Sequence, residues 1–332
     1  MRRQTILFAS MAILTAVLFA LDLAMGSVDI PLRHIWGALT GGDCPATTAR
    51  IVLNIRLIKA IVAILAGAAL SVSGLQMQTL FRNPLAGPYV LGISSGASLG
   101  VAVYILGAPL IGMSAAMGAL GIAGAAWIGA AAVLAVIAAA GHRIKDIMVI
   151  LILGMMLSSG ISAIVQILQY LSKDEALKSF IIWTMGSLGD VTAPQLYVLV
   201  PAIIAGLIMA VVTIKPLNLL LFGEEYAVTM GLNLSRTRGL LFISTTLLAG
   251  TVTAYCGPIG FIGLAIPHVA RMLWADSDHR VLVPGTILTG ATVLLLCDII
   301  SKSLTLPINA ITALLGIPVV IWVVLRNKSI TV

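Results

Sequence analysis

Ten long apolar stretches divide this chain, and short segments with Pro, Gly or charged residues separate them. A helix that crosses a lipid bilayer needs about 20 predominantly apolar residues, and segments of this kind recur along the whole sequence. The ten stretches are residues 5–25, 51–80, 91–106, 114–140, 147–171, 196–214, 239–256, 259–273, 282–304 and 310–325. This pattern predicts a polytopic membrane protein with about ten transmembrane helices.

Composition and pattern together exclude two other fold classes. Only 9% of the residues are charged, whereas a water-soluble domain usually carries about 25%. A transmembrane β-barrel would show short segments that alternate apolar and polar residues, but the apolar runs here are continuous. We therefore expect a single all-α transmembrane domain over residues 1–332, in which the frequent glycines allow the helices to pack closely.

The basic residues predict the orientation in the membrane. The start of the chain, Met1-Arg2-Arg3 before an apolar run, resembles a signal peptide, but we expect it to be retained as the first helix. With the N-terminus in the cytoplasm, twelve of the 19 Lys and Arg residues lie inside and seven outside. Basic residues concentrate on the cytoplasmic side of membrane proteins. An even number of helices then places both termini in the cytoplasm.

The chain lacks a site for a nucleotide. No Lys follows a Gly, so the G-x-x-x-x-G-K-[ST] phosphate loop is missing. We expect this chain to bind no cofactor, and we expect ATP and magnesium to bind a partner subunit if transport is ATP-driven. An ion-coupled secondary transporter is the alternative. It predicts acidic residues at mid-membrane, whereas the acids here lie near helix ends or in loops.

The fifth apolar stretch carries a polar stripe, Ser158, Ser162, Gln166 and Gln169. The spacings of four, four and three residues place these side chains on one face of a helix. An unpaired amide in hydrocarbon costs roughly 2–7 kcal/mol, so this face should meet water or another helix. The stripe is either part of a translocation path or a set of interhelical hydrogen bonds.

Two further features concern the organisation of the chain. The third and eighth stretches are short and are flanked by Pro and Gly, which predicts an inverted repeat of helices two to five (about 51–171) and seven to ten (about 239–325).

The longest polar stretch on the inner side is 215–238, where Glu224 and Glu225 suit the first turn of a short helix. Gly231 suits the end of that helix, and Ser235 is a candidate cap for the next turn.

Four segments, in the right order, resemble one family of transporters. They are SGLQMQTLFRNPLAGPYVLGISSGAS (73–98), GEEYAVTMGLNLSRTRG (223–239), GPIGFIGLAIPHVARMLWADSDHRVLVP (257–284) and LPINAITALLGIPVVIWVVL (306–325). The first contains R-N-P-L-A-x-P-x-x-L-G-x-S-x-G-A. Together they resemble the permease subunits of ATP-binding-cassette (ABC) importers for vitamin B12, haem and ferric siderophores.

The resemblance implies a machine in the bacterial inner membrane. Two copies of the permease would form a homodimer around a central path. Two ATPase subunits would bind on the cytoplasmic side, and a periplasmic substrate-binding protein would deliver an iron chelate or cobalamin. The chain itself would not be an enzyme.

The resemblance also assigns candidate residues. Its fifth helix lines the path, so Ser158, Ser162, Gln166 and Gln169 become path residues, with Gly154 at the inner end allowing the two copies to approach. The polar segment 215–238 becomes the coupling segment, through Glu224, Glu225, Met230 and Arg236. Basic residues near the outer helix ends, here Arg56, Lys59 and Lys302, would receive acidic residues of the binding protein. The alternatives are contacts with lipid headgroups or, for Lys302, an ion pair with Asp298.

Two features of the sequence are compatible with an enzyme. Residues 92–96, GISSG, match the G-x-S-x-G pattern of a nucleophile elbow, but that motif needs a turn between a strand and a helix. An intramembrane protease would need a His within the bilayer, for which His268 is the candidate. We expect neither activity.

Overall fold

The computed structural model describes residues 2–26, 28–107, 119–144 and 146–326, and these residues form helices, turns and loops without a β-strand. Seven helical segments are long and apolar enough to span a membrane, and three shorter apolar helices complete the set. The ten segments are α1 (Arg2–Ala24), α3–η1–α4 (Ala46–Ile51, Val52–Arg56, Leu57–Leu80), α5–η3 (Ile93–Ala102, Val103–Gly107), α6 (Ala119–Arg143), α7 (Ile147–Leu171), α9 (Ala193–Val212), α12–η5–α13 (Leu234–Thr245, Thr246–Gly250, Thr251–Cys256), α14 (Ile262–Trp274), α15 (His279–Leu304) and α16 (Ile308–Arg326). Each of the ten predicted stretches therefore contains an apolar helix, and residues 114–118 of the fourth stretch lie outside the described residues.

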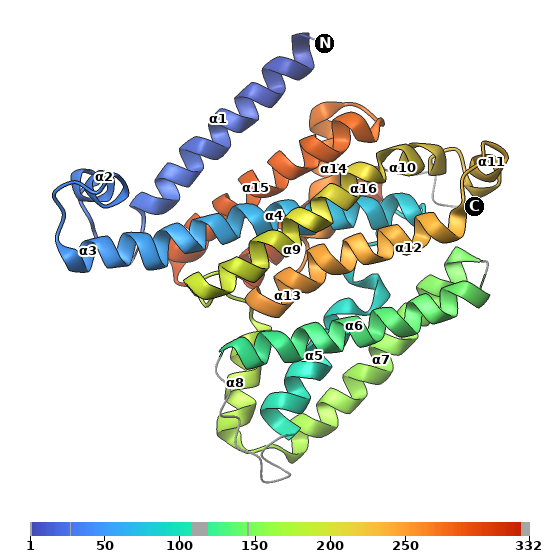
Figure 1. Cartoon of the computed structure of the whole chain (residues 1–332), viewed down its shortest axis with the longest axis horizontal. Helices are drawn as coiled ribbons and strands as arrows, with labels where there is room; N and C mark the ends of the chain where they lie inside the picture. Colours follow the sequence, from blue (N-terminus) through green and yellow to red (C-terminus); the bar gives the residue numbers. More distant parts are fainter. Residues whose placement is uncertain (1, 27, 108–118, 145, 327–332) are drawn as a thin grey trace.

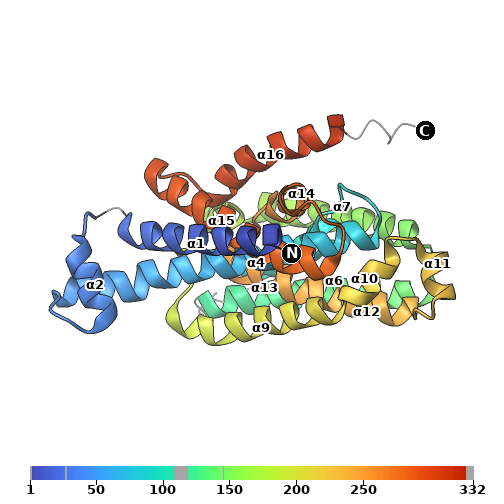
Figure 2. The same ribbon diagram turned by 90° about the horizontal axis from the view of Figure 1, so that it is seen from above.

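Among the described residues, five shorter helices connect these segments. They are α2 (Leu32–Thr40), η2 (Pro88–Leu91), α8 (Asp174–Thr184), α10 (Ile214–Leu220) and α11 (Glu224–Thr229). Figure 1 shows α2 and α3 at one end of the long axis and α10 and α11 at the other. In Figure 2, α16 covers one face of the bundle and α9 lies on the opposite face.

Side-chain caps fix where several helices begin. Asp146 accepts a hydrogen bond from the Met148 N–H at the start of α7, and Asp278 does the same for Arg280 at the start of α15. Such caps satisfy amide groups that have no partner within the helix. The cap of α12 is Asn233, which accepts from the Arg236 N–H. The expectation that Ser235 caps this turn was therefore wrong, because the helix begins one residue before it.

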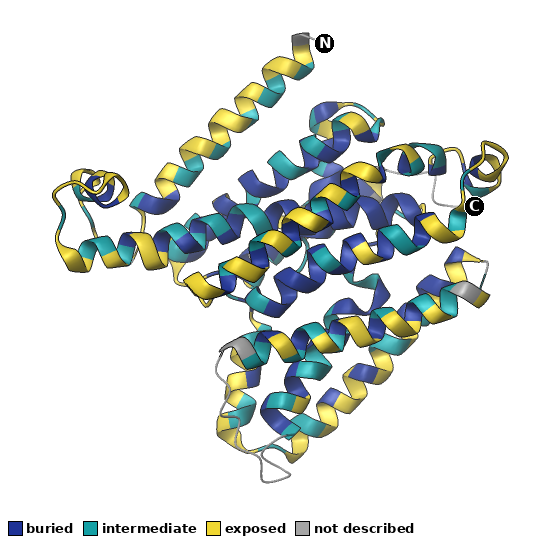
Figure 3. Ribbon diagram, in the orientation of Figure 1, coloured by how far each residue is buried: buried dark blue, intermediate teal, exposed yellow. Residues whose placement is uncertain are grey.

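Glycine determines how closely the central helices pack. At the crossing of α4 and α15, Gly67 and Gly290 face each other, and a Cβ on either would overlap the carbonyl oxygen of the other. Gly96 of α5 and Gly129 of α6 make the same reciprocal contact. In a membrane, close backbone approach replaces the hydrophobic effect as a source of helix association. Figure 3 shows α4 largely buried within the bundle and α1 largely exposed at its edge.

Candidate functional site

Two hollows lie along one side of α7. The first, of about 430 Å³, is lined by Leu85–Val90, Ser158 and the start of α14, and the second, of about 260 Å³, by Ser162, Gln166 and Gln169. Ser95 of α5 lines both. The four polar residues predicted on one face of α7 therefore border these two neighbouring hollows, which we call together the groove between α5 and α7.

Hydrogen bonding separates the serines of this stripe from its glutamines. Ser158 donates to the carbonyl of Gly154 at 2.8 Å, and Ser162 donates to the carbonyl of Ser158 at 2.9 Å. These bonds stay within α7. The amides of Gln166 and Gln169 make no side-chain hydrogen bond to the described residues. Within the described part of the chain no second helix thus bonds these two amides, and both border the groove.

The sequence interpretation missed the opposite wall of the groove. Ser94, Ser95 and Ser98 of α5 line the second hollow, together with Phe180 and Thr184 of α8. Ser94 and Ser98 are four residues apart and lie on one face of the helix, with Ser95 beside them. Helical periodicity in the sequence could therefore have identified this group. Seven polar side chains from α5 and α7, with Thr184 of α8, therefore line the two hollows of the groove.

Gly154 allows a close contact within its own chain. It is buried, and a Cβ at this position would lie within 3.2 Å of the Leu91 Cα and still closer to the Val90 carbonyl. The close approach that this glycine allows is therefore between α7 and η2 of the same chain. The expected contact between two copies at Gly154 stays a prediction.

The coupling segment forms α10, α11 and the first turn of α12. Glu224 and Glu225 occupy the first turn of α11 as predicted. Glu224 accepts hydrogen bonds from Arg238 Nη2 on both carboxylate oxygens at 2.8 Å, so it fastens α11 to α12. Glu225, Met230 and Arg236 are exposed.

An apolar patch surrounds α11 that the sequence interpretation did not identify. We define the α11 patch as Leu221, Phe222, Tyr226, Val228 and Met230, all of them exposed large side chains. It lies at the end of the molecule opposite α2 (Figure 1). An exposed apolar cluster with charged neighbours is typical of a protein contact surface.

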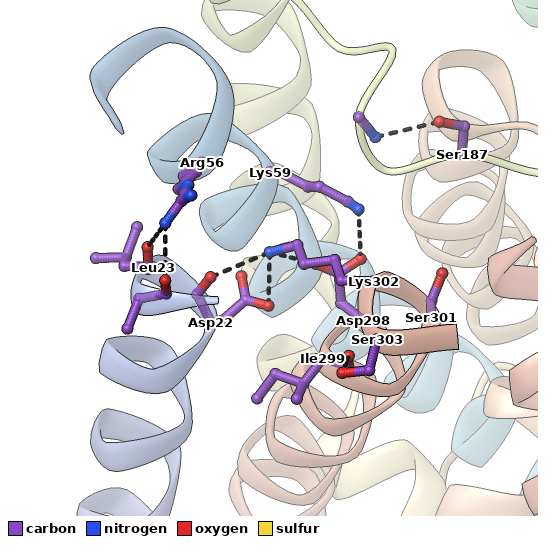
Figure 4. Close-up of polar contacts among 12 residues, drawn as sticks. Asp22, Leu23, Arg56, Lys59, Ser187, Asp298, Ile299, Ser301, Lys302 and Ser303 are labelled. Carbon is purple, nitrogen blue, oxygen red and sulfur yellow. Dashed lines mark hydrogen bonds and ion pairs between the residues drawn. The ribbon is translucent and has the colours of Figure 1, made fainter. Parts of the chain in front are cut away.

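Arg56, one of the three expected docking residues, is buried at the junction of η1 and α4 (Figure 4). Its Nη1 donates to the carbonyls of Leu23 at 2.9 Å and Ala24 at 2.8 Å, and its Nη2 donates to the carbonyl of Val28. These carbonyls end α1, and a basic side chain there satisfies acceptors that have no partner in the helix. Arg56 therefore caps α1 and does not point outward.

Lys302 and Lys59 belong to an ion cluster with two carboxylates of zero exposure (Figure 4). Lys302 Nζ lies 2.8 Å from Asp22 and 2.9 Å from Asp298, and Lys59 Nζ lies 3.0 Å from Asp298. The alternative interpretation of Lys302, an ion pair with Asp298, is confirmed. Side-chain exposure is 11% for Lys302 and 21% for Lys59. Lys59 is thus the most accessible of the three expected docking residues.

The residues of the two enzymatic interpretations have structural partners. Ser94 lies in α5, next to Gly92 at the helix start, with no strand before it among the described residues. His268 Nε2 donates to the carbonyl of Pro84 at 2.8 Å. His279 follows the Asp278 cap, and its ring contacts Asn218 and Thr79. Accepting bonds from the Arg280 N–H and from Asn218 lowers the pKa of Asp278, which keeps the cap ionised.

Comparison with known proteins gives full-length matches. The model of the FecCD transport family matches residues 14–326. The hemin transport system permease protein of Yersinia pestis is 36% identical, over 99% of this chain and 98% of its own length. A vitamin B12 import system permease protein of Salmonella typhi is 40% identical, over 83% of this chain and 84% of its own. A solved structure, described as an inward-facing conformation of a putative metal-chelate type ABC transporter, superposes with a TM-score of 0.84 at 29% identity and covers 97% of this chain and 99% of its own.

Proposed function

Because the chain belongs to the FecCD transport family, we propose that it is the permease subunit of an ABC importer that brings haem, cobalamin or a ferric siderophore into the cytoplasm. The observation that carries this proposal is the polar groove between α5 and α7, which runs along a chain otherwise suited to lipid. Haem and cobalamin come from the names of the relatives, a hemin permease and a vitamin B12 permease, and the ferric siderophore comes from the resemblance of the sequence motifs. The chain acts as a transport subunit and catalyses no covalent reaction.

The groove supports a homodimer in the bacterial inner membrane. Gln166 is exposed on the single chain, and an exposed amide facing hydrocarbon is costly. A second copy that placed its own α5 and α7 opposite would enclose the groove and convert it into a path. Ser158, Ser162, Gln166 and Gln169 would then line that path, while the two bundles offer alternating access.

Each end of the molecule suits one further partner. The α11 patch, with Glu225 and Arg236 beside it, would receive the ATPase subunit, which binds ATP and magnesium. Glu224 would contribute indirectly, by holding α11 on Arg238. The binding protein would dock at the outer end. Of the three predicted docking residues, Arg56, Lys59 and Lys302, Lys59 is the most accessible.

Uptake by the reconstituted complex tests this function. The permease, its ATPase and its binding protein are placed in sealed vesicles, and radiolabelled haem, cobalamin and ferric siderophores are supplied outside. We expect ATP-dependent accumulation of one ligand class, and none with an ATPase subunit that binds but cannot hydrolyse ATP. Accumulation that follows an ion gradient without ATP would contradict the proposal and favour a secondary transporter.

The groove makes a prediction of its own for α7. Cysteine at Ser158, Ser162 or Gln166 should react with a water-soluble thiol reagent in the assembled complex, because the stripe faces water. Reactivity should change when ATP is trapped. Ile164, exposed on the other side of α7, is the matched control, and its cysteine should stay unreactive because it faces lipid. Equal inertness of all four positions in every nucleotide state would move the path to another helix.

The orientation is tested by labelling from one side of the membrane. Lys173 begins α8 and Ser235 lies in the first turn of α12, and both are exposed. In a Cys44→Ser background, an impermeant maleimide added to spheroplasts should label a cysteine at Lys173. A cysteine at Ser235 should react only after permeabilisation. Labelling of both from outside would refute cytoplasmic termini.

A further inference from the structure

The short helix α2 exposes an apolar stripe that no part of this chain covers among the described residues. Its buried side, Ile35, Gly37 and Ala38, packs against the outer end of α3–η1–α4. The other side presents Leu32, Trp36 and Leu39, at positions i, i+4 and i+7 of one helix face. Leu32 is 73% exposed and Trp36 is 70% exposed. We define these three residues as the α2 stripe.

The length of α3–η1–α4 sets the level of α2 relative to the membrane. This helix has 35 residues and is about 52 Å long, so it extends well beyond a hydrocarbon core of about 30 Å. Arg56 and the ion cluster at Lys59 mark where charged groups begin on the outer side. Helix α2 contacts Ala49 and Val52. These two residues lie about 6–11 Å beyond Arg56 along the helix axis, on the outer side. The headgroup layer is roughly 5–8 Å thick on each side, so α2 lies at its level.

The α2 stripe also continues the lipid-facing surface of α1. Exposed apolar side chains follow one another along the chain at Val17, Leu21, Met25, Val28 and Leu32. Helix α1 lies at the edge of the bundle, and α7 and α8, which border the groove, lie at the opposite edge (Figure 1). The stripe is therefore remote from the surface that a second copy or a docked ligand would use.

We propose that α2 is an interfacial helix that lies in the outer headgroup layer and inserts Leu32, Trp36 and Leu39 toward the acyl chains. Trp is enriched at this level of a bilayer because its ring is apolar and its N–H is polar. Arg33, exposed beside the stripe, is placed to meet lipid phosphates. Because α2 packs on the segment that ends in Arg56, its contact with lipid fixes the depth of the outer end of α3–η1–α4.

Spin labels measure the depth of the stripe directly. Single cysteines at Leu32 and at Trp36, in a Cys44→Ser background, are labelled with a nitroxide, and the full-length permease is placed in lipid nanodiscs. Accessibility to oxygen is compared with accessibility to a water-soluble nickel chelate. Asp43, exposed in the loop after α2, is the aqueous control. We expect the oxygen-to-nickel ratio at Leu32 and Trp36 to exceed that at Asp43 several-fold.

Three outcomes would overturn the proposal. The first is nickel accessibility at Leu32 and Trp36 equal to that at Asp43. The second is protection that appears only when the binding protein is added, which would make the stripe a docking surface for protein. The third is a short distance between labels on two permease copies.

A second experiment needs no spin label. Brominated lipid should quench a smaller fraction of the total tryptophan fluorescence in Trp36→Phe than in the wild type. An unchanged quenched fraction would refute the proposal.

Discussion

Replacing Lys302 with Met is expected to destabilise the permease by about 3–5 kcal/mol, the cost of leaving a buried charge without its partner. Lys302 lies within 2.9 Å of both Asp22 and Asp298, and neither carboxylate is exposed. In the variant, Asp22 has no other cation in the cluster. The measurement is thermal unfolding of the detergent-solubilised protein, in which the midpoint should fall sharply.

Two companion variants separate charge from shape. Lys59→Met should have a much smaller effect, because Lys59 is partly exposed and Asp298 keeps Lys302. Asp22→Asn, added to Lys302→Met, should recover most of the lost stability, since Asp298 keeps Lys59 as its partner and no buried charge is left unpaired. A Lys302→Met protein as stable as the wild type would show that the cluster is not a source of stability.

Placing Asp at both Phe222 and Met230 should abolish association with the ATPase subunit and reduce ligand-stimulated ATP hydrolysis by at least about tenfold. These side chains are 70% and 55% exposed on the single chain, so the substitutions should leave the fold unchanged. A central apolar anchor in an interface contributes roughly 2 kcal/mol or more, and a buried carboxylate without a partner adds its desolvation cost. The measurements are co-purification of the two subunits and ATP turnover in vesicles.

Two matched substitutions in and just before α11 show which property matters. Phe222→Leu keeps an apolar side chain and should keep most of the stimulation. Glu225→Gln removes an exposed charge of α11 outside the apolar patch and should have a modest effect that fades at high salt. Full stimulation in the double Asp variant would exclude the α11 patch as the coupling surface.

The membrane helices were predictable because the bilayer imposes a length and a composition on each one. The polar stripe on α7 was predictable for a similar reason, since helical periodicity alone places Ser158, Ser162, Gln166 and Gln169 on one side. The short helices α2 and α8 were missed, because nine or eleven residues at the membrane surface carry no comparable constraint.

The outer basic residues show where sequence reasoning reaches its limit. Arg56 and Lys59 share a helix face in the sequence, but Arg56 reaches carbonyls about 30 residues earlier, while Lys59 reaches Asp298. Gly154 likewise serves a contact with η2 that depends on how α7 crosses it. Such contacts between distant segments are set by the tertiary packing, which charge counts and spacing do not contain.

The ion pair between Asp22 and Lys302 has a consequence for biosynthesis. The two residues are 280 positions apart, and a ribosome that adds 5–20 residues per second needs about 14–56 s to make the chain between them. During that interval α1 is already in the membrane, but Asp22 lacks the cation that will neutralise it, and α1 lacks its main neighbour α15. The first helix to be inserted is thus among the last to be fixed in place. A chain truncated before α15 would keep an unpaired carboxylate at the membrane surface, which distinguishes an unfinished permease from a complete one.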